Sequence, residues 1–177
     1  YIFVRDPVTE PLFASLEAAA GRGVECRLLV DALGSKAFLK KDAKRLMAAG
    51  VRVVKALPPG LFRRTATTAR YDLRNHRKIA VIDGRTAFTG SHNVTDPSYG
   101  GKAGGRLWRD LTLRLAGPVA LQLQGVFMED WYVETGEALP MEEAFPRPVR
   151  AGLAVIQTVP SGPSYPWQNY QRLVVSA

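Results

Sequence analysis

Apolar residues recur with two different periods along the first third of the chain, and together they predict alternating strands and helices. Three short apolar runs predict strands, namely residues 1–4, 24–30 and 51–56. Two longer segments repeat apolar residues at helical spacing, namely residues 10–20 and 36–49. Thr9 followed by Pro11 is typical of a helix start, and Gly50 of a helix end. This alternation predicts an α/β fold with a mixed, largely parallel β-sheet flanked by helices.

The pattern then changes and predicts a β-hairpin. Residues 76–82 alternate and are rich in β-forming side chains, and Asp83-Gly84 is typical of a tight turn before a second strand over residues 85–89. Further elements are predicted in this order: a strand at 111–115, a helix at 117–134, a short strand at 153–159 and an incomplete helix at 167–177.

Composition limits the classes of protein and site that fit this chain. Its 177 residues are 46% apolar and 23% charged, which is enough for one globular α/β domain. The longest apolar runs are strand-sized, so none is expected to cross a bilayer. A single cysteine, Cys26, excludes an internal disulfide, and two histidines without metal-ligand spacing argue against a metal. We therefore expect no metal and no cofactor.

The net charge of +8 is concentrated in one part of the chain. Residues 36–85 contain 14 basic and 3 acidic residues, whereas those after Leu115 contain 3 basic and 6 acidic residues. The positive segment favours phosphate-bearing partners, either anionic lipid headgroups or nucleic acid. The lysines of the predicted helix at 36–49 fit a solvated helix face. The arginines between residues 63 and 77 fit a substrate role and a solvated role equally well.

One loop lies within this positive segment and another follows it. Residues 61–70 are rich in Arg and Thr and follow a predicted strand, where α/β proteins usually bind ligands. Residues 96–105 are rich in glycine, which is compatible with a lid over a substrate or with a simple surface loop.

The predicted hairpin carries a group of residues suited to binding a phosphate. On a strand, His76 and Lys78 share one face because they are two residues apart, and Ser91 and Asn93 share a face for the same reason. A hairpin in register would place the second pair across from the first. An imidazole, an ammonium, a hydroxyl and an amide together fit a tetrahedral oxyanion. Taken singly, each has a plainer explanation: a surface His, a solvated Lys or, for Asp83, only a turn.

The spacing HxKxxxxD followed by GSxN resembles the HKD motif of the phospholipase D superfamily. In this chain its positions are His76, Lys78, Asp83, Gly90, Ser91 and Asn93. Several flanking runs are similar to the N-terminal catalytic half of bacterial cardiolipin synthases, including YIF at 1–3, GVECRLLVD at 23–31, RNHRK at 74–78, WRDL at 108–111 and GPV at 117–119. The resemblance covers nearly the whole chain and implies a phospholipase D-like fold.

The resemblance also implies a reaction and roles for the residues. It implies a phosphatidyltransferase or phosphodiesterase in which His76 forms a covalent phosphohistidine. Lys78 and Asn93 would hold the phosphate oxygens, with Ser91 assisting. Asp110 would accept a hydrogen bond from the imidazole, although a strand-edge charge paired with its neighbour Arg109 is a rival explanation. His92 is expected on the opposite face and is not assigned a catalytic role.

The chain contains one HxK pair, His76 and Lys78. It would therefore supply only half of an active site of this type. Either two copies pair, as in single-motif nucleases, or this is one half of a two-motif enzyme. We expect a first phospholipase D-like domain at 1–135, a Pro- and Glu-rich linker at 136–150 and the start of a truncated second repeat at 151–177. Because residue 1 opens directly on an apolar strand, we also expect a longer parent chain. The isolated chain is expected to have little or no activity.

Each possible function implies its own partners. For a phosphatidyltransferase, the first possibility, the partners are a phosphatidylglycerol-like anionic phospholipid substrate and a second HKD half or a second copy of the chain. The parent protein would associate with the bacterial membrane, while this chain itself is expected to be soluble. Nucleic acid is the partner only under the alternative of a dimeric endonuclease or phosphodiesterase. A catalytically silent phosphate-binding or membrane-binding module is the third possibility.

Overall fold

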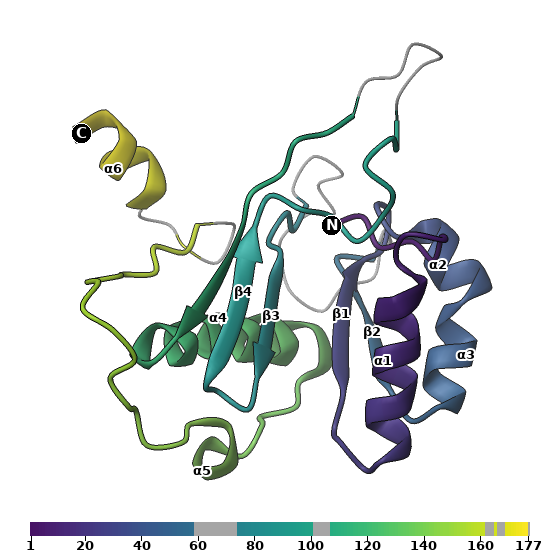
Figure 1. The fold of residues 1–177 in the computed structure, drawn as a ribbon, viewed down its shortest axis with the longest axis horizontal. Helices are drawn as coiled ribbons and strands as arrows, with labels where there is room; N and C mark the ends of the chain where they lie inside the picture. The colour runs from purple at the N-terminus through teal and green to yellow at the C-terminus, as the bar shows by residue number, and fades with distance from the viewer. Residues whose placement is uncertain (59–73, 101–106, 162–164, 166–168, 177) are drawn as a thin grey trace. The chain divides into compact units, whose positions relative to one another are not determined.

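The computed structural model describes residues 1–58, 74–100, 107–161, 165 and 169–176. The chain divides into two compact units (Figure 1). Unit 1 contains Tyr1–His76 and Ser91–Leu111, and unit 2 contains Arg77–Gly90 and Thr112–Ala177. Helices flank a parallel pair of strands in unit 1 and an antiparallel sheet in unit 2, which confirms the α/β class.

Unit 1 is built on two parallel strands with helical cover. Strand β1 (Arg27–Asp31) pairs with β2 (Arg52–Ala56), and the connection between them contains α2 (Lys36–Lys41) and α3 (Ala43–Ala48). Helix α1 (Glu10–Gly21) precedes β1 and lies beside these elements in Figure 1. The predicted first strand is reduced to one parallel bridge between Phe3 and Val94, with hydrogen bonds on either side of it.

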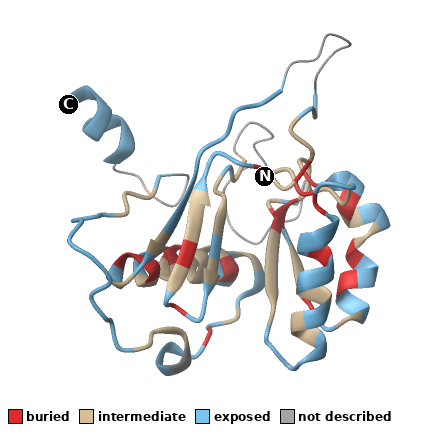
Figure 2. Cartoon of the chain, in the orientation of Figure 1, coloured by how far each residue is buried: buried red, intermediate tan, exposed pale blue. Residues whose placement is uncertain are grey.

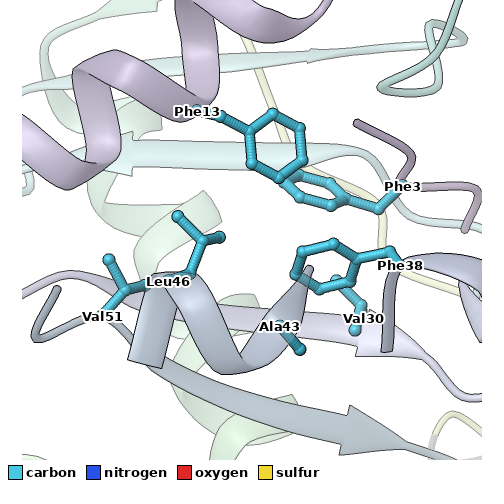
Figure 3. Close-up of a cluster of buried hydrophobic side chains, with 7 residues drawn as sticks. All are labelled: Phe3, Phe13, Val30, Phe38, Ala43, Leu46 and Val51. Atoms are coloured by element: carbon cyan, nitrogen blue, oxygen red, sulfur yellow. The ribbon is translucent and has the colours of Figure 1, made fainter. Parts of the chain in front are cut away.

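Three phenylalanine rings form the centre of the unit 1 core (Figure 3). Phe3, Phe13 and Phe38 lie with ring centroids 4.9 to 5.8 Å apart, in tilted or edge-on arrangements that aromatic pairs prefer. Aliphatic side chains from β1, from α3 and from the residue before β2 complete the cluster: Val30, Ala43, Leu46 and Val51. The core therefore joins the start of the chain to the helices α1, α2 and α3.

Unit 2 is an antiparallel sheet against one long helix. Its strands are β3 (Ile79–Ile82), β4 (Thr86–Gly90) and β5 (Thr112–Ala116), in that order, and the buried face of α4 (Pro118–Thr135) packs on them. The short α5 (Met141–Ala144) and the exposed α6 (Asn169–Ser176) follow (Figure 2). No helix in the described ranges has the length and apolar character that crossing a membrane requires.

The hairpin turn forms where the Asp83-Gly84 pair predicts it. Asp83 and Gly84 both have positive φ, 52° and 63°, and the amide of Arg85 donates to the carbonyl of Ile82. Two successive left-handed residues are the geometry that suits a two-stranded ribbon, and Asp-Gly tolerates it well. A Cβ at Gly84 would lie 2.7 Å from Pro146 Cδ, so packing also selects glycine there.

Four expectations from the sequence were wrong in detail. Strand β3 begins at Ile79, so His76 and Lys78 precede it. The helix predicted over 36–49 is broken at Asp42, which ends α2 and starts α3. Met47, which the apolar spacing of the predicted helix at 36–49 would place on its inward face, is 47% exposed. Residues 153–159 form no strand, because a strand needs a neighbour to satisfy its backbone and these residues pair with none of the described strands.

The aromatic core predicts that alanine substitutions at two adjacent positions of α1 differ sharply in their effect on stability. Phe13 is fully buried, whereas Leu12 is 42% exposed. Phe13→Ala should lower the free energy of unfolding by about 3–5 kcal/mol, because it leaves a cavity among the rings. Leu12→Ala, the matched control, should change it by about 0.5 kcal/mol or less. Urea denaturation measures both, and equal effects would contradict this core.

Candidate active site

His76 presents its imidazole at the surface of unit 1. The residue is exposed, and its ring stacks on Tyr1 with centroids 4.0 Å apart and planes 18° apart. An exposed imidazole braced by an aromatic ring keeps access to a substrate while losing rotational freedom. Both properties suit a nucleophile or a proton carrier.

The first two residues of the chain connect His76 to Asn93. The Tyr1 carbonyl accepts a 2.8 Å hydrogen bond from the Oγ of Ser35, which is fully buried. The Ile2 amide donates to Asn93 Oδ1 at 3.0 Å. The peptide group that joins Tyr1 to Ile2, next to the ring that stacks on His76, is therefore held by two hydrogen bonds, one of them accepted by a motif residue.

Asn93 is buried and bonded at both ends of its side-chain amide. Besides accepting from Ile2, it donates from Nδ2 to the Tyr99 hydroxyl at 2.9 Å. Tyr99 in turn stacks on Trp108, whose Nε1 donates to the Tyr99 carbonyl. Nδ2 carries a second hydrogen, so a phosphate-binding role for Asn93 stays a prediction beside this structural role.

Ser91 and Asp110 form a pair. Ser91 Oγ donates to Asp110 Oδ1 at 2.7 Å and accepts from the Leu111 amide at 3.1 Å. Among the described residues, the hydrogen-bond partner of the Asp110 carboxylate is Ser91 and not His76. The sequence-based roles of Ser91 on the phosphate and of Asp110 on the imidazole stay predictions.

The remaining motif residues belong to unit 2. Lys78 is half-buried and directly precedes β3, Asp83 lies in the hairpin turn, and Gly90 is the last residue of β4, opposite Thr112. Because His76 and Lys78 precede the strand, strand alternation does not set their directions. The chain boundary between the two units falls between His76 and Arg77.

The sequence analysis missed a buried ion pair that supports the motif. Asp31 is 3% exposed and accepts from Arg74 Nε at 2.9 Å, while Arg74 also donates to the Leu57 carbonyl at 2.9 Å. The other Asp31 oxygen accepts from the amides of Leu33 and Gly34. An Asp ending an apolar strand, followed three residues later by Gly, was the available signal. Its partner, 43 residues away, was not readable from the sequence.

The described residues contain no group of three or more His, Cys, Asp or Glu side chains able to hold a metal. The Arg-rich loop at 61–70 and part of the glycine-rich stretch, residues 101–105, lie outside the described residues. The geometry on unit 1 is thus an accessible imidazole on an aromatic support, next to a network anchored by Asn93.

Comparison with known proteins identifies the family. The family described as "Cardiolipin synthase, PLD-like domain" matches residues 1–131, about three-quarters of the chain. The chain belongs to this family of PLD-like domains.

Curated relatives of this PLD-like domain match along its entire length. It is 44% identical to the cardiolipin synthase A of Pectobacterium carotovorum and 43% identical to that of Pectobacterium atrosepticum. It is 39% identical to the cardiolipin synthase A of Yersinia pseudotuberculosis. In each case the match covers 100% of this chain and 37% of the relative. The chain therefore spans little more than a third of the length of these relatives.

Removing one partner of the buried ion pair should destabilise the PLD-like domain strongly. Asp31→Asn leaves the Arg74 guanidinium, whose side chain is 8% exposed, without its counter-charge. We expect a loss of about 3–5 kcal/mol in the free energy of unfolding. Glu25→Gln is the control, because the Glu25 side chain is 75% exposed in its pair with Arg27, and it should cost about 0–1 kcal/mol. Chemical denaturation measures both, and a small effect at Asp31 would contradict its structural importance.

Asp6 adds a pH-dependent anchor for the segment that follows Asn93. Its carboxylate accepts from the amides of Val8, Thr9 and Asp96, the last at 2.7 Å. Partial burial acts to raise the pKa of Asp6, but these hydrogen bonds outweigh it and leave the pKa below the ordinary value of 3.8. The ionised form is thus favoured by folding.

The direction of this pKa shift predicts how the stability lost in the Asp6→Asn variant depends on pH. A lowered pKa in the folded state stabilises the protein above the unfolded pKa, and this contribution is lost as pH falls through the folded pKa. The variant should be less stable by about 1–2 kcal/mol at neutral pH, because an amide NH₂ replaces an acceptor of the Asp96 amide. Denaturation at several pH values should show the difference shrinking below pH 3.8. A constant difference would contradict the assignment.

Proposed function

We propose that this chain is the first half of a phosphatidyltransferase of the cardiolipin synthase type, with residues 136–150 as a linker and residues 151–177 as the start of the second half. Similarity to cardiolipin synthase A over the full chain carries the proposal. An exposed His76 within an HxKxxxxD and GSxN pattern supports it chemically.

The reaction proceeds in two displacements at phosphorus. An imidazole nitrogen of His76 attacks the phosphodiester, a P–N bond forms, and the P–O bond to the leaving alcohol breaks. A second imidazole, from the other half of the site, protonates the departing oxygen, which leaves as the neutral alcohol. It then removes the proton of an acceptor hydroxyl, whose oxygen attacks phosphorus and releases His76. Lys78, Ser91 and Asn93 stabilise the phosphate oxygens, and Asp110, which accepts a hydrogen bond from Ser91, is the proposed acceptor that fixes the tautomer of the His76 imidazole.

Phosphatidylglycerol is the substrate that fits this scheme best. One molecule supplies the phosphatidyl group and a second supplies the hydroxyl, so the products are cardiolipin and glycerol. The charge of +8 favours an anionic lipid surface, which is where we place the longer protein. A nuclease formed by two copies is the alternative, favoured by the single HxK and by the same charge.

The test uses the full-length enzyme containing this chain, incubated separately with phosphatidylglycerol vesicles and with single-stranded DNA. We expect cardiolipin and free glycerol, and intact DNA. His76→Ala should reduce the rate at least about a thousandfold, because it removes the nucleophile. His92→Ala, which changes the other exposed histidine, should keep the rate within about threefold.

Three outcomes would contradict the proposal. Cut DNA without lipid product would favour the dimeric nuclease. An active His76→Ala variant would remove the catalytic assignment. Turnover by the isolated chain as a monomer would contradict the half-site.

A further inference from the structure

Arg77, the residue between His76 and Lys78, is held by a cluster of contacts in unit 2. Its Nη1 donates to both carboxylate oxygens of Asp130, on α4, at 2.5 and 2.7 Å. The side chains of Arg77 and Asp130 are only 21% and 18% exposed. A pair this well covered restrains both side chains more than a surface pair does.

The same guanidinium also holds the segment that follows the linker. Arg77 Nη2 donates to the Ser161 carbonyl at 2.7 Å, and the guanidinium carbon lies 5.5 Å from the centre of the Tyr165 ring. These contacts use the planar fork and the flat face of arginine, which lysine cannot reproduce. Arg77 therefore joins the start of unit 2, α4 and the post-linker segment.

Helix α4 binds that segment at two further points. The Thr158 amide donates to Gln122 Oε1 at 2.8 Å, and the Tyr165 hydroxyl donates to Glu129. Gln122 and Glu129 are seven residues apart, so they lie on one face of the helix. Burial, and then the bond to Glu129, raise the pKa of Tyr165 to about 12, so its hydroxyl keeps the proton it donates.

We propose that Arg77 is a positioning residue and that residues 158–161 with Tyr165 form a brace for it. Arg77 precedes Lys78 in the chain, and its side chain is fixed on α4 and on the brace. Fixing residue 77 restricts the backbone from which the Lys78 ammonium projects. The catalytic meaning of this arrangement rests on the proposed function, whereas its structural part does not.

The structural part can be tested on the chain itself by ¹⁵N relaxation. The backbone order parameters of Lys78 and Val159 should be near about 0.85, as in rigid structure. Arg77→Lys and Asp130→Asn should each lower both values below about 0.6. Tyr165→Phe, which keeps the ring, should have a smaller effect than Tyr165→Leu. Arg114→Lys, at an exposed arginine of β5, is the matched control and should change neither value.

The catalytic part requires the full-length enzyme with phosphatidylglycerol. Arg77→Lys and Asp130→Asn should lower kcat by about 10- to 100-fold, because a displaced Lys78 stabilises the transition state poorly. KM should change by less than about threefold, and the double variant should be no slower than the worse single one, since both break one anchor.

The results of these two experiments test the structural brace and the positioning role of Arg77 separately. Unchanged order parameters in both Arg77→Lys and Asp130→Asn would overturn the brace. Lower order parameters with unchanged kcat would overturn the positioning role. If the unaltered full-length enzyme makes no lipid product, the proposed function fails, and the order parameters still decide whether the brace exists.

Discussion

The buried pair of Asp31 and Arg74 is the interaction on which the rest of unit 1 depends. One carboxylate oxygen binds the guanidinium, and the other accepts two amides of the loop after β1. That loop leads to Ser35, which holds the Tyr1 carbonyl, and the Tyr1 ring supports His76. One side chain at the end of a strand thus organises the loop, the chain start and the segment leading into the motif.

A buried pair of this kind provides geometry more than net stability. Moving two charges out of water carries a desolvation cost that their attraction only offsets when each is fully bonded. Here Arg74 also binds the Leu57 carbonyl, so it is tied to the end of β2 as well as to β1. The position of residue 74 is therefore tightly defined two residues before His76, and such accuracy suits the nucleophile role proposed for His76.

The motif is divided along the chain between the two units, and each side has its own arginine. Arg74 anchors the approach to His76 in unit 1, and Arg77 lies at the start of unit 2, before Lys78. Ser91 and Asn93 are bonded to Asp110, Ile2 and Tyr99. In this PLD-like domain, the side chains of Ser91 and Asn93 are therefore part of the hydrogen-bonded scaffold.

Local rules predicted much of this protein from its sequence. Periodicity and turn chemistry predicted the helices α1 and α4, the strands β1 and β2, and the Asp83-Gly84 turn, because these depend on neighbouring residues. The spacing of the HKD motif indicated the family, which the comparison confirmed. Tertiary structure alone decided the partners of distant polar groups: Asp31 with Arg74, Asn93 with Ile2, and Arg77 with Asp130. Such partners are 43 to 91 residues apart, and hydrogen-bonding capacity by itself does not specify which distant group will satisfy it.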